Sequence, residues 1–535
     1  MEQNNNNISS NIFSSEGKNS GDQNKDIDSK FQSRQQEFSN EENFSQIKES
    51  AMTNELSLGQ NFRNKIFMQK RLKKSINIET TQSLKSKLTI PLDLYENCNN
   101  MKIELNKFPD IITAFRTNDL NQKYYGLVGI RKLLTLQNAP IQELIDIGIT
   151  AELLSLLDNS YPEFQYEALW CLTNIATGTS DQANSIVVKG GIEKINKIMD
   201  SPIEELRIQA IWLIGNLASD SQKIRDSLIN SKTFDKISTI LASTSENQKS
   251  LIKQSTWALS NFFRVKPTPP YTIVKKCLNA LTRAMFILQD DKEDKKDFLN
   301  DSCYIFYYMT EHYKDSIKDL LDIGIIPKII QCLDYDDTFV QLNCLRVVGN
   351  IASGNANQTQ LLIDWGVLNY LKKTIRNDKK QIRKESAWIL SNIAAGTQKQ
   401  IETLIAENFL PILEYAIKND DPEIKKESIW ALCNLTSVEN PEYLKKILND
   451  GILRIMSDCL KMEDAKYLAV CLEGFGNLLA FGKKSNPNGP NPIVIELEKM
   501  GMFDVLEKLQ LHPVEIVYEK TLKLLETYFE TQNIE

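Results

Sequence analysis

The chain has 535 residues, of which 41% are hydrophobic and 25% are charged, and it contains only 21 Gly and 16 Pro. This length exceeds what one globular core usually supports, and the scarcity of turn-forming residues favours an all-α protein over a turn-rich β fold. Residues 1–90 carry a formal charge of +2 and the remainder −9, so the acidic body disfavours direct nucleic-acid binding and suits basic partners.

Three further features exclude other kinds of protein. The polar, Asn-rich start lacks a signal-peptide pattern and no run of 18 apolar residues occurs, which predicts an intracellular protein without membrane insertion. The nine cysteines are never spaced as Cys-x-x-Cys, so we expect neither disulfides nor a zinc site. Only two histidines are present, His312 and His512, which argues against a metal centre, a cofactor or general-base catalysis.

The first 90 residues are expected to form a flexible arm. Residues 1–60 are rich in Asn, Ser and Gln with few apolar positions, a composition typical of disorder. Between residues 56 and 78 acidic residues are absent, while basic residues accumulate among apolar ones. This segment predicts either a basic helix that folds on an acidic partner or a solvated basic linker. Its basic residues are Arg63, Lys65, Lys70, Arg71, Lys73 and Lys74.

A repeated pattern organises the chain from about residue 100 to its end. The motif Trp-x-x-x-Asn occurs at the same position of five repeats, and related segments occupy the remaining repeats. The Trp position is taken, in chain order, by Trp170, Trp212, Trp257, Tyr304, Arg346, Trp388, Trp430 and Glu473. Successive spacings are 42, 45, 47, 42, 42, 42 and 43 residues. This period fits armadillo or HEAT repeats, so we expect a right-handed superhelical solenoid of about ten armadillo repeats over residues 100–535, with the last repeat at about 490–530.

Each marked helix presents two rows of side chains. In the first copy, Ala168, Leu172 and Ile175 form an apolar stripe expected to face the core. Trp170 lies about 200° around the helix from Leu172, on the same side as Asn174 one turn later. Stacked repeats should therefore align the tryptophans and asparagines of the motif into one row, here called the Trp/Asn row. The alternative is that these residues only pack between repeats.

The Trp/Asn row suits an extended, positively charged peptide. An Asn amide offers both a donor and an acceptor to a peptide backbone. A lysine stem can lie between adjacent indoles while its ammonium gains cation–π attraction of about 0.5–2 kcal/mol. Acidic residues at the ends of these slots would then select cations over neutral side chains.

At these residues the sequence resembles the importin-α family, armadillo-repeat adaptors that bind nuclear localisation signals. The basic, Pro-rich stretch 264–270 and the closing segment YEKTLKLLETYFE extend the resemblance. It implies a nuclear import adaptor that shuttles between cytoplasm and nucleus and binds cargo through Lys/Arg-rich signals. It also implies that a divergent arm segment at about 34–78 binds importin-β and competes with cargo for the groove, and that an export receptor binds the C-terminal repeats.

The resemblance further implies two cargo sites on the Trp/Asn row. The major site would comprise Trp170, Asn174, Gln209, Trp212, Asn216, Asp220, Trp257, Asn261 and Asp301. The minor site would comprise Tyr304, Arg346, Asn350, Glu385, Trp388, Asn392, Glu427, Trp430 and Asn434. Asp220 is expected to hold the key lysine of the signal, and Arg346 to be a spacer that pairs locally.

Departures from the family pattern bear on these sites. Ala183 stands where the family usually has a threonine, Tyr304 stands where it has a tryptophan, and residues 355–357 lack the usual Thr and acidic residues, so we expect a weaker minor site. The alternative function is an armadillo scaffold of the signalling or cytoskeletal kind that binds other proteins. An enzyme is not expected, because the stretch from Gly476 to Ser485 fails as a phosphate loop, with five residues between its glycines and a helical context.

Overall fold

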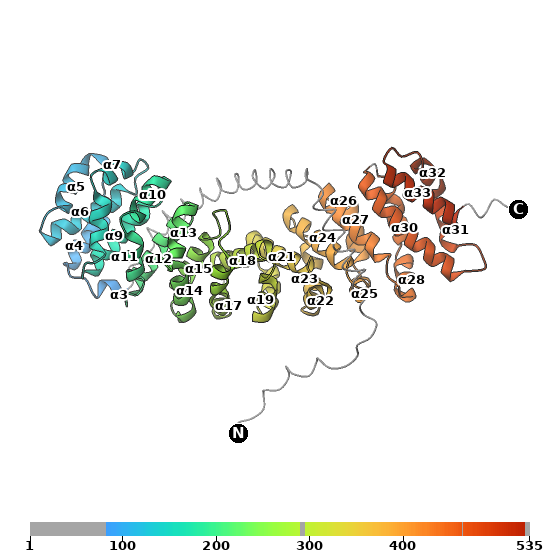
Figure 1. The fold of residues 1–535 in the computed structure, drawn as a ribbon, viewed down its shortest axis with the longest axis horizontal. Helices are drawn as coiled ribbons and strands as arrows, with labels where there is room; N and C mark the ends of the chain where they lie inside the picture. Colours follow the sequence, from blue (N-terminus) through green and yellow to red (C-terminus); the bar gives the residue numbers. More distant parts are fainter. Residues whose placement is uncertain (1–81, 289–294, 463, 530–535) are drawn as a thin grey trace, which may run out of the picture.

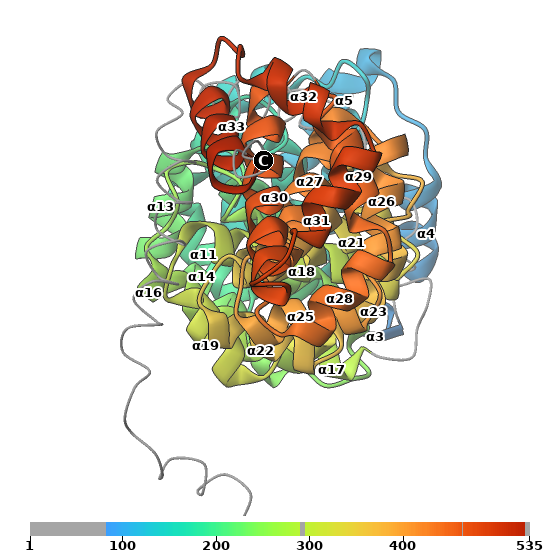
Figure 2. The ribbon, with the colours of Figure 1, turned by 90° about the vertical axis from the view of Figure 1, so that its right-hand side faces the viewer.

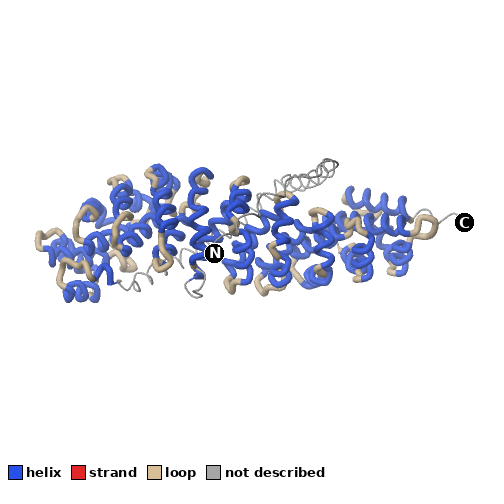
Figure 3. The backbone as a smooth tube through the Cα atoms, turned by 90° about the horizontal axis from the view of Figure 1, so that it is seen from below, coloured by secondary structure: helices blue, strands red, loops and turns tan. Residues whose placement is uncertain are grey.

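The computed structural model describes residues 82–288, 295–462 and 464–529. Within these ranges all regular secondary structure is helical, and the helices follow one another along an elongated body (Figures 1 and 3). The predicted all-α repeat solenoid is therefore confirmed. The arm predicted at 1–90 lies outside the described residues up to position 81, and with it the basic segment at 34–78 and its residues from Arg63 to Lys74.

The described residues from α4 to α33 form ten units of three helices, and the third helix of each unit is the longest. The first helices are α4 (Leu92–Asn100), α7 (Ile141–Asp146), α10 (Ser180–Val187), α13 (Gln222–Asn230), α16 (Tyr271–Val274), α19 (Ser316–Ile323), α22 (Ala356–Asp364), α25 (Gln398–Ala406), α28 (Pro441–Asn449) and α31 (Pro492–Lys499). The second helices are α5 (Phe108–Phe115), α8 (Ile149–Leu156), α11 (Gly191–Ile198), α14 (Thr233–Ser243), α17 (Leu278–Ile287), α20 (Ile326–Gln331), α23 (Val367–Thr374), α26 (Leu410–Asn419), α29 (Ile452–Cys459) and α32 (Met502–Leu509). The third helices are α6 (Leu120–Leu133), α9 (Pro162–Ile175), α12 (Glu204–Ala218), α15 (Lys249–Asn261), α18 (Lys295–His312), α21 (Thr338–Ala352), α24 (Lys380–Ala394), α27 (Pro422–Leu435), α30 (Ala465–Ser485) and α33 (Glu515–Tyr528). The remaining elements are α3 (Gln82–Lys85), η1 (Leu105–Lys107), η2 (Lys275–Cys277) and η3 (Cys332–Asp334).

The third helices form the inner layer of the solenoid. Each one contacts the third helix of the next unit, in an unbroken series from α6 to α33. In the view along the long axis, α18, α21 and α30 lie nearer the middle of the body than α19, α22 and α25 (Figure 2). Ala168, Leu172 and Ile175 are fully buried, as their spacing predicts. Stacking of these apolar stripes gives one core that grows with every unit.

A left-handed residue joins the first and second helices in most units. Gly190 is one of six glycines that adopt φ between 68° and 90° at or next to this junction, and Lys232 and Asn408 take φ of 59° and 58° in two other units. Glycine enters this conformation without the steric cost that a Cβ imposes. The two short helices of these units can therefore follow one another with only two or three residues between them.

Ion pairs join the outer helices of adjacent units. Three pairs have N···O distances of 2.6–2.8 Å, namely Lys236–Asp200, Lys276–Asp235 and Lys373–Asp334, and a fourth, Lys194–Asp158, belongs to the same series. We call these four pairs the outer ion-pair series. Every side chain in it is at least 26% exposed, so water screens these pairs and each contributes little to stability.

Three further observations concern membrane-spanning helices, metal ligands and cysteines. None of the described helices has the length and apolar character needed to cross a bilayer. Across the described ranges, His, Cys, Asp and Glu side chains form no group of three that could hold a metal ion. All nine cysteines are free and buried, so they serve as small core residues.

Candidate functional site

The five Trp/Asn pairs all lie on third helices, α9, α12, α15, α24 and α27. Trp170, Trp257, Trp388 and Trp430 are partly exposed, whereas Trp212 is only 7% exposed. The expectation of an accessible row is therefore met less fully at Trp212. Periodicity describes one helix at a time and neglects the adjacent units that cover it.

Glycines of the preceding unit make room for two of the indoles. A Cβ added to Gly215 on α12 would lie 2.3 Å from Cζ3 of Trp257, and one added to Gly349 on α21 would lie 2.0 Å from Cζ3 of Trp388. Ordinary contacts of a Cβ lie between 3.4 and 4 Å. These rings therefore lie directly on the backbone of the neighbouring third helix. Sequence reasoning missed both glycines, although each directly precedes the Asn of its own unit.

Half of the six asparagines in the two predicted sites use one amide N–H to bind the preceding unit. Asn216 Nδ2 donates to the carbonyl oxygen of Thr173 at 3.3 Å, and Asn261 Nδ2 donates to the carbonyl oxygen of Gly215 at 3.0 Å. Asn350 Nδ2 likewise donates to Thr310 Oγ1 at 3.0 Å. Stacking therefore uses one of the two N–H donors of each of these amides, so the expectation that they offer a donor and an acceptor to a peptide stays a prediction.

The other three asparagines of the two predicted sites have no hydrogen-bond partner at Nδ2. The Nδ2 atoms of Asn174, Asn392 and Asn434 are buried and have no hydrogen-bond partner. A buried amide donor without a partner costs free energy comparable to a lost hydrogen bond. These three positions, one in the predicted major site and two in the predicted minor site, are the places where a peptide carbonyl would gain most.

An arginine of the chain covers one end of the predicted major site. The guanidinium carbon of Arg131 lies 4.2 Å from the ring centroid of Trp170, and Arg131 forms a buried ion pair with Glu167. Burial opposes the charge of Arg131, but the adjacent Glu167 carboxylate outweighs it and raises the pKa of the guanidinium. One face of Trp170 is therefore already filled by a permanent cation. Nothing in a single sequence marks Arg131 as the partner of this indole.

A second arginine covers Tyr304, the aromatic residue that follows the predicted major site along the Trp/Asn row. The guanidinium carbon of Arg264, in the stretch that follows α15, lies 5.4 Å from the ring centroid of Tyr304. Arg264 Nη2 also lies 3.9 Å from Asp301 Oδ1. Tyr304, which replaces the usual tryptophan, is therefore engaged within the chain.

The polar residues beside the predicted major site differ in how far they are engaged. Gln209 is 2% exposed and donates from Nε2 to Thr173 Oγ1 at 2.9 Å. Asp301 is 8% exposed and faces Arg264. Asp220 is partly exposed just after α12, and its Oδ2 atom is buried without a hydrogen-bond partner. Asp220 can thus accept a cation at Oδ2 without losing an existing contact.

Both acidic residues of the predicted minor site already have partners. Arg346 Nε donates to Glu385 Oε1 at 3.1 Å, and its guanidinium carbon lies 5.1 Å from the ring centroid of Tyr307. Ser391 Oγ donates to Glu427 Oε2 at 2.6 Å. The expected local pairing of Arg346 is confirmed, and a cationic peptide would have to compete with these contacts.

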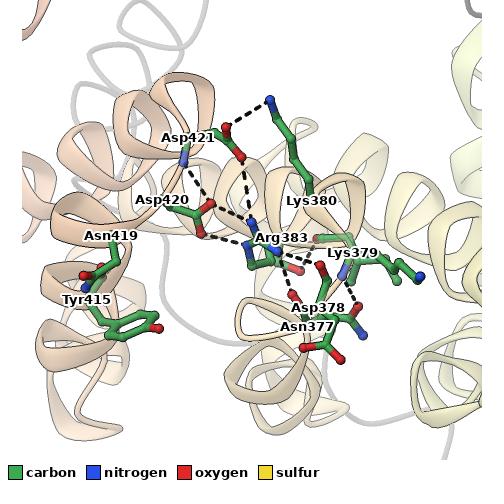
Figure 4. Close-up of polar contacts among 11 residues, drawn as sticks. Asn377, Asp378, Lys379, Lys380, Arg383, Tyr415, Asn419, Asp420 and Asp421 are labelled. Carbon is green, nitrogen blue, oxygen red and sulfur yellow. Dashed lines mark hydrogen bonds and ion pairs between the residues drawn. The ribbon is translucent and has the colours of Figure 1, made fainter.

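A polar network fixes the two helices that carry the predicted minor site. Arg383 on α24 donates from Nε and Nη2 to the two carboxylate oxygens of Asp420 at 2.8 and 2.9 Å, and from Nη1 to the carbonyl oxygen of Asn377 at 2.9 Å (Figure 4). Asp420 lies between α26 and α27. Burial raises the pKa of Asp420, but the bonds from Arg383 outweigh it and hold that pKa below its usual value. The network therefore sets the spacing of α24 and α27.

Comparison with known proteins identifies similar sequences over most of the chain. A family described as "Armadillo/beta-catenin-like repeat" matches residues 137–177 and 397–437, and one described as "Atypical Arm repeat" matches residues 491–535. A third family, "Proteasome non-ATPase 26S subunit", matches residues 301–391 only.

Several similar proteins are importin-α subunits. Importin subunit alpha-1b of Oryza sativa is 34% identical over 82% of both chains, and Importin subunit alpha-3 of Arabidopsis thaliana is 33% identical over 82% of both. Importin subunit alpha-B of Dictyostelium discoideum is 38% identical over 89% of both. The crystal structure of an engineered protein is similar with a TM-score of 0.62 at 22% identity, covering 79% of this chain and 98% of that one, which supports the fold.

Proposed function

We propose, because this chain belongs to the importin-α family, that it is an adaptor for nuclear import of proteins carrying lysine/arginine-rich localisation signals. Membership of this family makes it a transport adaptor rather than an enzyme. The partners implied are such cargo proteins and importin-β, and the location implied is shuttling between cytoplasm and nucleus. The family also argues against the alternative of a signalling or cytoskeletal scaffold.

The major site is proposed to hold the core of the signal. Since Arg131 covers Trp170 and Arg264 covers Tyr304, which follows the major site along the row, the intervals left for lysine stems lie between Trp170 and Trp212 and between Trp212 and Trp257. Asn174 offers the N–H donors of its unpartnered Nδ2 to the peptide backbone, while Asn216 and Asn261 each offer an acceptor and their second N–H. The observation that carries the proposal is the buried, unpartnered Oδ2 of Asp220, placed at the end of α12.

The minor site is proposed to bind more weakly than the major site. Its open donors on Asn392 and Asn434 favour a peptide backbone. However, Glu385 is paired with Arg346 and Glu427 with Ser391. A cation arriving there replaces an existing interaction instead of satisfying an empty one, so the net gain is smaller.

Fluorescence anisotropy of the full-length chain tests the cargo proposal. A fluorescein-labelled lysine-rich peptide should bind, and the same peptide with glutamine at every lysine should not. Asp220→Lys should raise the Kd by about 30-fold or more, because it places a like charge at the lysine position. Asp458→Lys, at an exposed position of α29, is the matched control and should leave the Kd unchanged. Equal affinity for the lysine and glutamine peptides would rule the proposal out.

The arm is proposed to bind importin-β and to compete with cargo in the major site, and an export receptor is proposed to contact the C-terminal repeats at about 490–530. A double change in the full chain, Lys70→Glu with Arg71→Glu, tests the arm. Capture of the chain by immobilised importin-β should fall, and affinity for the lysine-rich peptide should rise, because a tethered competitor acts at an effective concentration of about millimolar. Unchanged values in both assays would exclude a role for these residues.

A further inference from the structure

A short segment ahead of the first unit lies across two third helices. Residues 84–91, here called the strap, begin in α3, which contacts α12. Leu84 and Ile90 are 0% and 6% exposed, so the strap is anchored by apolar side chains at both ends. Lys87 and Thr89 between these anchors are exposed.

Two carboxylates of the third helices hold the backbone of the strap. Leu84 N donates to Glu205 Oε1 at 3.3 Å, and Thr89 N donates to Glu163 Oε1 at 3.0 Å. The hydroxyl of Thr89 also donates to that oxygen of Glu163. Since Glu205 lies on α12 and Glu163 on α9, the strap runs opposite to the direction of the units.

These carboxylates belong to the same helical face as the Trp/Asn row. Glu163 precedes Trp170 by seven residues, and Glu205 precedes Trp212 by seven residues. Seven residues turn an α-helix by about 700°, so each glutamate stands within about 20° of its tryptophan, two turns away. The strap therefore covers the amino-terminal end of the face that carries the proposed major site.

The strap leaves both carboxylates half satisfied. Glu163 and Glu205 are 0% and 4% exposed, and the Oε2 atom of each is buried without a hydrogen-bond partner. Burial of an ionised carboxylate is unfavourable unless its oxygens are paired. The ammonium of Lys85, at the start of the strap, lies 3.8 Å from Glu96 Oε1 instead. Docking of the strap is thus favoured by its apolar anchors and opposed by the two carboxylates it covers.

We propose that Glu163 and Glu205 form a further cation subsite, and that a lysine/arginine-rich flank of an extended cargo peptide displaces the strap to reach it. This inference rests on the proposed function. Ammonium or guanidinium groups would donate charge-assisted hydrogen bonds to the oxygens that the strap leaves empty, and such bonds are about twice as strong as neutral ones. Cargo with a long basic segment would therefore gain affinity that a short signal cannot.

Hydrogen exchange of the full-length chain tests whether the strap is displaced. One sample receives a lysine-rich peptide of about eight residues, and the other receives the same core lengthened to about sixteen residues by lysine and arginine, which adds roughly 26 Å of extended chain. Saturation with the long peptide should speed exchange of the amides of Leu84 and Thr89 at least tenfold. The short peptide should leave their exchange unchanged.

The affinities of the long and the short peptide distinguish the proposed subsite from the rest of the groove. The double variant Glu163→Gln, Glu205→Gln should raise the Kd of the long peptide roughly tenfold, at about threefold to fivefold for each lost charge. It should leave the Kd of the short peptide unchanged. The matched control is Glu423→Gln, at the equivalent position seven residues before Trp430 on α27, where the carboxylate is 55% exposed and pairs with a lysine. It should change neither affinity.

A variant of the strap should change the affinity for the long peptide in the opposite direction. Leu84→Ala removes one apolar anchor, so the strap should undock more often and the long peptide should bind severalfold more tightly, while the midpoint of urea unfolding shows whether the solenoid is intact. The inference is overturned if the strap stays protected at saturating long peptide, or if Leu84→Ala leaves the long peptide unaffected. Failure of both peptides to bind would instead refute the proposed function.

Discussion

Replacing Gly215 with alanine perturbs the Trp/Asn row at one defined place. The added Cβ would lie 2.3, 2.9 and 2.9 Å from Cζ3, Cε3 and Cη2 of Trp257, where ordinary contact begins at 3.4 Å. The indole must therefore retreat by about 1 Å from the neighbouring helix. Because α12 also carries Trp212, this shift moves the Trp257 indole out of its position relative to Trp212 and so distorts the interval that is proposed to receive a lysine stem.

The change in the free energy of unfolding follows from two opposing contributions, helix propensity and overpacking. Alanine improves helix propensity over glycine by about 1 kcal/mol, and overpacking costs about 1–3 kcal/mol, so unfolding should become easier by no more than about 2 kcal/mol. Binding should lose a large part of one cation–π contact, about 1–2 kcal/mol, which corresponds to a roughly 5- to 30-fold higher Kd. Urea unfolding followed by circular dichroism measures the first quantity, and anisotropy with the lysine-rich peptide measures the second.

Gly476 provides a matched control for this change. It also lies inside a third helix, α30, but a Cβ there would meet only Leu524 Cδ2, at 3.5 Å. Gly476→Ala should therefore leave the Kd unchanged. The reasoning is refuted if Gly215→Ala binds the peptide like the wild type while its tryptophan emission shows that the indole has moved, or if both variants lose affinity equally.

Three further predictions concern the same face and its support. Gly349→Ala, whose Cβ would lie 2.0 Å from Trp388, should reduce the affinity of a short lysine-rich peptide by less than about threefold in calorimetry, because the weaker minor site contributes little. Asp220→Asn should raise the Kd of that peptide about tenfold and reduce its salt dependence, since one charge is lost. Arg383→Ala should lower the free energy of unfolding by about 1–2 kcal/mol at pH 7. Because Arg383 holds the pKa of Asp420 below its usual value, this stabilisation is present above the unfolded pKa of about 3.9 and is lost as the pH falls through the folded pKa, so urea unfolding of the two proteins should converge in that acid range.

The sequence alone predicts the repeated units and their inner helices well, because both depend on local spacing. The burial of Ala168, Leu172 and Ile175 follows from the helical period of one segment. The placement of Trp170 and Asn174 on another side of the same helix follows from the same period. A pattern that returns in successive units also predicts that these units stack.

Features that depend on two units could not be predicted in this way. One amide N–H of Asn216 is bound to Thr173 of the preceding unit, which reduces what the amide can offer to a ligand. Arg131 reaches Trp170 from another unit, and no spacing rule connects them. The repeated glutamate seven residues before a tryptophan is a visible signal, but only the folded chain shows that the strap covers Glu163.

The outer ion-pair series has a mechanical consequence. It links four pairs of adjacent units along one edge through exposed charges, while the third helices are joined along the other edge by apolar packing. Added salt screens the charges, since the Debye length falls from about 8 Å at physiological ionic strength to about 3 Å at 1 M, but it leaves the packed edge intact. Added salt should therefore weaken contacts along the ion-paired edge only. The spacing between successive indoles, which the packed third helices set, should change little with ionic strength.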